Sequence, residues 1–255
     1  MGTITVLVVD DEPKIRGIVR EALRDDAKRV LEARTGKEAI ALAESERPDL
    51  IVLDLGLPDM DGADVCRSIR AWSNVPILVL SARAAEGEKA ALLDAGADDY
   101  VTKPFSTVEL TARARAQVRR SQMAPVPGGE GPLVIGSLTI DTGRRRVVRD
   151  DVDVHLTPTE WGLLRALISR ADRPVTHERL FREVWGGAEG DAQQYLRVYV
   201  AHLRRKLERD SYHPLLIVTE PGVGYRFALE AAQRGASRAA DPDDVQAADG
   251  DAAIE

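Results

Sequence analysis

Acidic residues end two apolar, β-branched runs of the sequence. Asp10 and Asp11 end the run VLVVDD, and Asp54 ends the run LIVLD. Two carboxylates about 4 Å apart repel by roughly 1 kcal/mol in water and about 4 kcal/mol at an intermediate dielectric, so clustered acids favour a bound cation. Oxygen ligands with room for water suit Mg²⁺. These residue types therefore predict a magnesium site that contains Asp10, Asp11 and Asp54.

Two further polar elements indicate what such a site would do. Ser81 ends the run ILVLS, and Lys103 with Pro104 follows DDYVT. A serine hydroxyl and a lysine ammonium group can bind phosphoryl oxygens, and a carboxylate beside them can attack phosphorus to form an aspartyl phosphate. Asp54 is the predicted nucleophile because it ends the central strand and is followed by the loop LGLPDMDG.

A parallel sheet is needed to bring these residues together. Apolar runs at 4–9, 50–53 and 76–80, with weaker ones at 28–31 and 100–102, alternate with stretches of helical spacing. This alternation predicts βαβ units and an α/β fold. Ligands bind beyond the carboxyl ends of the strands in such sheets, which is where the polar elements fall.

The sequence changes character after this region. Residues 123–132, MAPVPGGEGP, contain three Pro and three Gly and predict a linker. Residues 133–156 then alternate like short antiparallel strands, and Thr157 is the expected N-cap of a helix. The remaining predicted elements are helices near 158–171, 176–185 and 192–209 and a hairpin at about 215–229.

The third of these helices has two different faces. Its apolar stripe is formed by Leu196, Val200, Leu203 and Leu207. The residues mostly off that stripe are Gln194, Arg197, Val198, Ala201, His202, Arg204 and Arg205. Such a helix can lie in the major groove of DNA, and an ordinary surface helix is the alternative that this pattern alone leaves open.

Charge limits how the chain could bind nucleic acid. The net charge is −7, with 21 acidic against 18 basic residues in 1–120, 15 against 15 in 121–230, and 6 against 2 in 231–255. No domain is basic, so DNA binding must rest on a local stripe of positive charge. The Ala- and Asp-rich end predicts a disordered tail.

Features of secreted or membrane proteins are not expected. Cys66 is the only cysteine, which precludes an intrachain disulfide and fits a reducing cytoplasm. The N-terminus does not resemble a signal peptide, and no apolar run approaches the roughly 18 residues of a membrane span.

The segments VLVVDDE, LIVLDLGLPDMDG, VLSAR and DDYVTKPF resemble the receiver domain of two-component response regulators, over residues 4–121. The resemblance implies a flavodoxin-like fold with strand order 2-1-3-4-5 and phosphate transfer from a sensor histidine kinase. It further implies these roles: phosphoacceptor Asp54; Mg²⁺ ligands Asp10, Asp11, Asp54 and the carbonyl group of Gly56; a phosphate-pairing Lys103 before a cis Pro104; and a switch pair, Ser81 and Tyr100.

The same resemblance suggests a dimer. Glu109, Arg113 and Arg120 share one helix face. In the OmpR/PhoB-type subfamily, matching positions form ion pairs across a symmetric receiver dimer, although scattered charges usually form only a solvated surface. The positions that this implies are Lys89, Asp98, Asp99, Glu109, Arg113 and Arg120.

LTPTEWGLLRALI, the third helix and VTEPGVGYRF resemble the winged helix-turn-helix domain of OmpR/PhoB-type regulators, over about residues 133–229. The implied ligand is promoter DNA. The expected contacts are Gln194, Tyr195, Arg197, Val198, His202, Arg204, Arg205 and Thr219. His202 and Pro221 stand where many members carry Arg, which predicts weaker or different DNA recognition.

The complete pattern predicts a receiver in 1–121, a linker in 122–132, a winged-helix domain in 133–230 and an acidic tail in 231–255. It is most similar to the Kdp-type branch, which implies control of potassium-transport genes by a phosphorylated dimer. The loop Gly186–Gln193 is a possible RNA polymerase contact by resemblance. A protein-interaction output is the alternative. A phosphotransferase is disfavoured because Gly56 stands where such enzymes carry a second acid.

Overall fold

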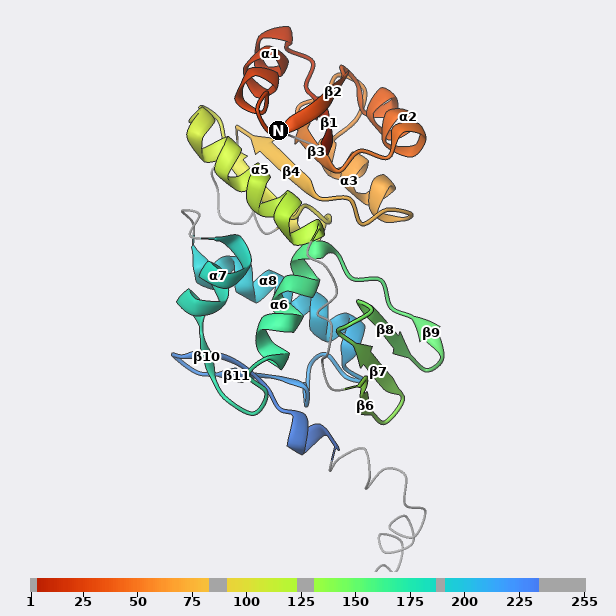
Figure 1. Cartoon of the computed structure of the whole chain (residues 1–255), viewed down its shortest axis with the longest axis vertical. Coiled ribbons are helices and arrows are strands. Elements are labelled where there is room, and N and C mark those ends of the chain that lie inside the picture. The colour runs from red at the N-terminus through yellow and green to blue at the C-terminus, as the bar shows by residue number, and fades with distance from the viewer. Residues whose placement is uncertain (1–3, 83–90, 123–130, 187–190, 234–255) are drawn as a thin grey trace, which may run out of the picture.

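The computed structural model describes residues 4–82, 91–122, 131–186 and 191–233. An N-terminal α/β domain lies against a C-terminal domain of helices and small sheets (Figure 1). Several predictions lie wholly or partly outside the described residues: Lys89, most of the linker, the middle of the loop Gly186–Gln193 and nearly all of the tail.

The N-terminal domain contains a five-stranded parallel sheet in the order β2-β1-β3-β4-β5, which confirms the predicted order. Its strands are β1 (Ile4–Val9), β2 (Ala27–Ala33), β3 (Leu50–Asp54), β4 (Ile77–Ser81) and β5 (Asp99–Thr102). Its helices are α1 (Pro13–Ala22), α2 (Gly36–Glu46), α3 (Gly62–Arg70) and α5 (Thr107–Ser121). Nearly every residue of β1, β3 and β4 is buried, as expected for strands covered on both faces.

The helices begin where side chains cap them. The Thr35 hydroxyl accepts a hydrogen bond from the backbone of Glu38, and the Ser106 hydroxyl accepts one from Val108 at the start of α5. These caps satisfy amide groups that a helix leaves unpaired at its first turn. They fix where α2 and α5 leave the sheet edge that carries the acidic residues.

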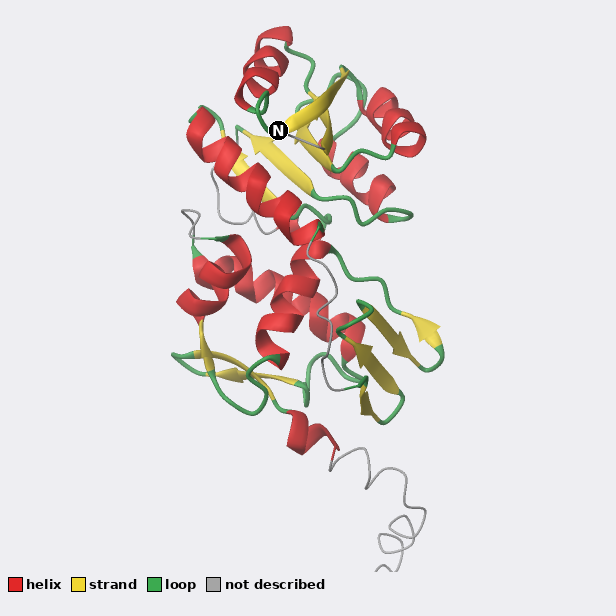
Figure 2. Ribbon diagram, in the orientation of Figure 1, coloured by secondary structure: helices red, strands yellow, loops and turns green. Residues whose placement is uncertain are grey.

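The C-terminal domain is a winged helix-turn-helix. Its strands are β6 (Leu133–Ile135), β7 (Leu138–Asp141), β8 (Arg146–Arg149), β9 (Val152–Asp153), β10 (Val175–Thr176), β11 (Ile217–Glu220) and β12 (Gly224–Phe227). Its helices are α6 (Pro158–Ile168), α7 (His177–Trp185) and α8 (Ala192–Leu207). Thr157 and Glu160 form the complete capping box of α6. The hairpin of β11 and β12 is the wing (Figure 2).

The aliphatic stripe of α8 lies in the core of this domain, as predicted. Leu196 and Leu203 are fully buried, and Val200 and Leu207 are nearly so. In the described parts of the chain, no helix combines the length and the apolar character needed to cross a membrane.

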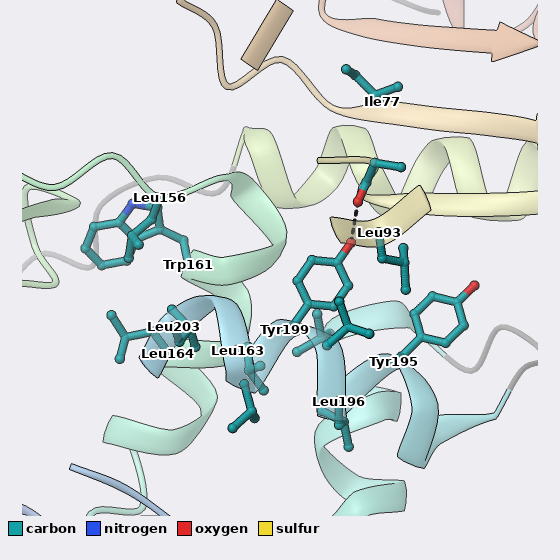
Figure 3. Close-up of a cluster of buried hydrophobic side chains, with 14 of the residues drawn as sticks. Ile77, Leu93, Leu156, Trp161, Leu163, Leu164, Tyr195, Leu196, Tyr199 and Leu203 are labelled. Carbon is teal, nitrogen blue, oxygen red and sulfur yellow. Dashed lines mark hydrogen bonds between the residues drawn. The ribbon is translucent and has the colours of Figure 1, made fainter. Parts of the chain in front are cut away.

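The two domains share one continuous hydrophobic cluster. Leu93 and Tyr100 of the receiver pack in the same cluster as Trp185, Tyr195 and Tyr199 of the winged-helix domain. Figure 3 shows Leu93 beside Tyr195 and Tyr199, and Figure 1 shows α5 above α6 and α7. The receiver therefore covers part of α8 in this arrangement, which we call the closed arrangement.

Candidate phosphorylation site and DNA-binding helix

Three carboxylates meet at the carboxyl edge of the parallel sheet. One ligand atom from each of Asp10, Asp11 and Asp54 lies within 4.8 Å of the other two. Asp10 and Asp54 are buried, whereas Asp11 is exposed. This donor set of carboxylate oxygens, open to water on one side, fits a hard divalent cation such as Mg²⁺.

Lys103 joins this cluster from the end of β5. Its ammonium nitrogen lies 2.8 Å from Oδ2 of Asp10 and 2.7 Å from Oδ1 of Asp54. Burial disfavours the charged amine, but hydrogen bonds and charges from both carboxylates outweigh that effect and raise the pKa of Lys103. Burial also raises the pKa of Asp10, against the opposing hydrogen bond from Lys103. The Lys103–Pro104 peptide bond is cis, and Pro104 is exposed.

Backbone groups hold Asp54 in place. The amide of Gly56 donates a 3.0 Å hydrogen bond to Oδ2 of Asp54. Gly62 lies so close behind that an added Cβ would be 2.6 Å from the Asp54 carbonyl oxygen and 2.7 Å from Cα of Leu55. The turn after β3 therefore requires glycine at position 62, which keeps the loop tight against the acidic cluster.

Arg16 was not a sequence candidate, yet it organises the same edge. Its guanidinium group donates hydrogen bonds to the backbone carbonyls of Asp10 (2.8 Å) and Asp11 (3.1 Å). It also pairs with Glu32 at 3.0 Å, and that contact is the largest cause of the lowered pKa of Glu32. A helical arginine beside an aspartate pair carries no recognisable signal in one sequence.

Ser81 and Tyr100 lie on neighbouring strands between the acidic cluster and the second domain. Ser81 ends β4, and its carbonyl group accepts a 2.7 Å hydrogen bond from the Lys103 amide. Tyr100 is buried in β5 because its ring stacks on Tyr195 of α8, with centroids 5.3 Å apart and planes at 16°. The predicted switch aromatic thus directly contacts the predicted DNA-binding helix.

Polar contacts also hold α8 against the receiver. The Tyr195 hydroxyl donates a 2.7 Å hydrogen bond to Asp99, and the Tyr199 hydroxyl donates one of 2.6 Å to the carbonyl of Ala97, drawn dashed in Figure 3. Nε2 of His202 lies 2.8 Å from Oδ1 of Asp94. These contacts bury Tyr199 together with Tyr195 and His202, two of the residues expected to contact DNA.

The expected DNA contacts fall into two groups. Tyr195, Val198 and His202 are buried in the closed arrangement, and Arg205 is exposed but bonded to Asp94 at 3.2 Å. The more accessible group is Gln194, Arg197, Arg204 and Thr219. Within it, Nη2 of Arg204 donates to the carbonyl of Ile217 and to the Thr219 hydroxyl, which joins α8 to the wing.

The residues expected at a dimer interface make contacts within the chain. Asp98 accepts a hydrogen bond from Arg70, while Arg113 pairs with Asp99 at 2.9 Å and with Glu109 at 3.0 Å. Arg120 donates to the carbonyl of Val184 at the end of α7. Of these contacts, only that of Arg120 reaches the second domain, and the others join residues within the receiver.

Sequence reasoning missed Tyr199, and a signal for it exists. Tyr195, Tyr199 and His202 stand at i, i+4 and i+7 and form a second buried stripe beside the aliphatic one. A second apolar or aromatic stripe on one helix indicates a second packing partner. Arg70, which binds Asp98 from α3, gave no comparable signal.

Comparisons with known proteins agree with this architecture. Residues 6–115 match the family "Response regulator receiver domain", and residues 151–227 match "Transcriptional regulatory protein, C terminal". The chain is 47% identical over 225 residues to the KDP operon transcriptional regulatory protein KdpE of Escherichia coli K12, covering 88% of this chain and 99% of that protein. It is 48% identical over 223 residues to KdpE of Mycobacterium tuberculosis H37Rv, covering 87% and 98%. A solved RitR mutant has a TM-score of 0.70 at 25% identity, covering 88% and 98%.

Proposed function

Because the chain belongs to the OmpR/PhoB-type response regulators, we propose that phosphorylation of Asp54 controls how its winged-helix domain binds promoter DNA. One observation carries the proposal. The acidic cluster with Lys103 and the DNA-binding helix α8 are linked through a single receiver strand, β5, which carries Tyr100 and leads into Lys103.

The residues around Asp54 suit transfer of a phosphoryl group. A carboxylate oxygen of Asp54 forms a bond to phosphorus while the bond from phosphorus to the donor breaks, and the donor's leaving group keeps that electron pair. Lys103 is placed to pair with phosphoryl oxygens. The carboxylates of Asp10, Asp11 and Asp54, with the carbonyl of Gly56, would hold Mg²⁺, which neutralises the charge on the transferring group.

The signal then passes to α8 through the switch pair. A phosphoryl group on Asp54 offers strong acceptors to the Ser81 hydroxyl, and Tyr100 follows the serine inward. Movement of that ring breaks its stack on Tyr195 and weakens the closed arrangement. The freed helix can enter the major groove while the wing contacts the neighbouring groove.

Partners and targets follow from the family. A sensor histidine kinase supplies the phosphoryl group, and the protein acts in the cytoplasm, where DNA is bound. Two receivers pair through Asp98, Asp99, Glu109, Arg113 and Arg120, and Lys89 joins them by resemblance. This face becomes free only when α8 leaves, since Asp99 accepts a hydrogen bond from Tyr195. RNA polymerase contacts the loop Gly186–Gln193.

We place the regulated genes in potassium transport. The support is the Kdp-type sequence pattern together with 47–48% identity to two KdpE proteins over almost their whole length. A protein-interaction output remains the alternative class, and a gel-shift separates the two. A phosphotransferase is less consistent, because Gly56 cannot act as the acid or base needed for turnover.

The test is a gel-shift with DNA from upstream of the chain's own gene and of the potassium-transport genes of the same genome, with and without acetyl phosphate. We expect phosphorylation to tighten a specific shift, and Asp54→Asn to abolish both labelling and tightening. Labelling retained at another residue would reassign the phosphoacceptor. No specific shift in either condition would favour the interaction module.

A further inference from the structure

One face of α5 is pressed against the winged-helix domain and carries three polar residues. Arg113, Gln117 and Arg120 stand at i, i+4 and i+7, and all are buried. Arg120 contacts the winged-helix domain directly, because an added Cβ on Gly162 of α6 would lie 3.4 Å from Cδ of Arg120. Its guanidinium carbon lies 6.0 Å from the ring centroid of Trp185 on α7.

The two arginines of this face have opposite surroundings. Arg113 pairs with Asp99 and Glu109, and although burial opposes its charge, these carboxylates raise its pKa. Among the described residues, Arg120 makes one hydrogen bond, to the carbonyl of Val184. Its Nε and Nη2 atoms find no hydrogen-bond partner among the described residues, and burial lowers its pKa. Of the two arginines, Arg113 is paired directly with carboxylates, and Arg120 forms no such pair within the described parts of the chain.

Nearby carboxylates form no ion pair with Arg120 in the described parts of the chain. Oδ2 of Asp98 accepts hydrogen bonds from Arg70 and the amide of Ile77, whereas its Oδ1 atom has no hydrogen-bond partner among the described residues. Oδ1 of Asp99 accepts hydrogen bonds from Arg113 and Tyr195. Both carboxylates attract Arg120 only at longer range. An arginine stays protonated at neutral pH, so its burial without a paired carboxylate costs free energy.

Gln117 adds to this cost. Its side chain is fully buried, and neither its amide nitrogen nor its amide oxygen has a hydrogen-bond partner in the described parts of the chain. Separation of the domains would uncover the face of α5 and return Arg120 to water. The unfavourable burial of Arg120 therefore belongs to the closed arrangement and opposes the contacts of Tyr195, Tyr199 and His202.

We infer that Arg120 is a built-in destabiliser of the closed arrangement, which keeps the receiver's hold on α8 weak enough for phosphorylation to release it. The inference rests on the proposed function and adds to it the residue that sets the balance. Removal of the charge at similar volume should tighten the closed arrangement, although it removes a hydrogen bond and a contact with the Trp185 ring.

Single-molecule energy transfer measures this balance directly. Dyes are placed on Ser45→Cys of α2 and Tyr212→Cys, both exposed positions, in the full chain. Cys66 is buried and burial raises the pKa of its thiol to about 12, so it does not take up dye. At picomolar concentration no dimer forms, so the ratio of open to closed molecules reports the domain contact alone.

With acetyl phosphate present, we expect Arg120→Met to lower the open-to-closed ratio at least tenfold, and Gln117→Leu to lower it as well. Arg115→Met is the matched control, since it removes from the same helix an exposed charge that pairs with Asp26 inside the receiver, and it should change the ratio less than twofold. An unchanged or raised ratio in Arg120→Met, or an equal fall in both arginine variants, would overturn the inference.

The design separates this inference from the proposed function. Phosphodonor labelling of Asp54 shows that each variant has a folded receiver. If acetyl phosphate fails to raise the open-to-closed ratio of the dye-labelled protein with native Arg120, the proposed function is wrong in its regulatory step. If it raises that ratio but Arg120→Met behaves like Arg115→Met, only the role of Arg120 is wrong.

Discussion

Replacement of Tyr199 by Phe removes one hydroxyl group from the contact between α8 and the receiver. That hydroxyl donates a 2.6 Å hydrogen bond to the carbonyl of Ala97, and both residues are about 2% exposed. A net hydrogen bond contributes about 1 kcal/mol, and a buried carbonyl left without its partner costs somewhat more. We therefore expect the closed arrangement to lose about 1 to 1.4 kcal/mol.

That loss can be read as DNA affinity. The apparent dissociation constant equals the intrinsic one divided by the fraction of binding-competent molecules. When closed molecules dominate, Tyr199→Phe should tighten binding by the unphosphorylated protein about five- to tenfold. Binding by the phosphorylated protein should change much less, because most of those molecules are already open.

The assay is fluorescence anisotropy on labelled promoter DNA, with and without acetyl phosphate. Tyr212→Phe is the matched control, since Tyr212 is 89% exposed. Equal affinities of native and Tyr199→Phe protein without phosphate would refute the reasoning, because α8 would then not be limited by its contact with the receiver. An equal gain in both phosphorylation states would instead indicate an effect on the DNA interface itself.

Three further predictions concern the DNA contact, acid stability and thiol reactivity. Arg204→Ala should weaken DNA binding about tenfold or more, while Asp54 is still phosphorylated, because Arg204 is an expected DNA contact and also anchors α8 to Ile217 of the wing strand. An unchanged DNA affinity by anisotropy would show that Arg204 is not part of the DNA interface. The pKa of Glu32 is lowered, chiefly by the hydrogen bond from Arg16, so this pair stabilises the fold above the ordinary pKa of 4.5 and the stabilisation is lost as the pH falls through the lowered pKa. Glu32→Gln should therefore flatten that part of the curve of unfolding free energy against pH. A curve of unchanged slope would argue against the pair. Burial raises the pKa of Cys66 to about 12, so at pH 8 the folded protein should react with iodoacetamide far more slowly than the urea-unfolded protein, and comparable rates would contradict that burial.

The receiver was predictable because its chemistry stands at strand ends. Asp10, Asp54, Ser81 and Lys103 each follow an apolar run, and parallel strands bring such ends to one edge. The buried stripe of α8 was equally predictable, because helical spacing places Leu196, Val200, Leu203 and Leu207 on one face of the helix.

Docking of the domains was not predictable in the same way. From the sequence, Tyr195 and His202 were expected to contact DNA, whereas the closed arrangement buries both against the receiver. A residue that serves two alternative partners carries the same local pattern for each. The carboxylate that accepts from Tyr195, Asp99, lies nearly a hundred positions away, and no spacing rule links such residues.

The shared hydrophobic cluster has a consequence for how such proteins can be rearranged. Tyr100 of one domain and Tyr195 of the other form a single stacked pair, so the receiver's surface is shaped for this particular helix. A chimera that grafts a foreign receiver without a matching aromatic residue onto residues 133–230 would lose that fit, and its output domain would no longer be held by this stack. The two halves of the chain are thus matched parts, and recombination between regulators has to preserve both sides of one aromatic pair.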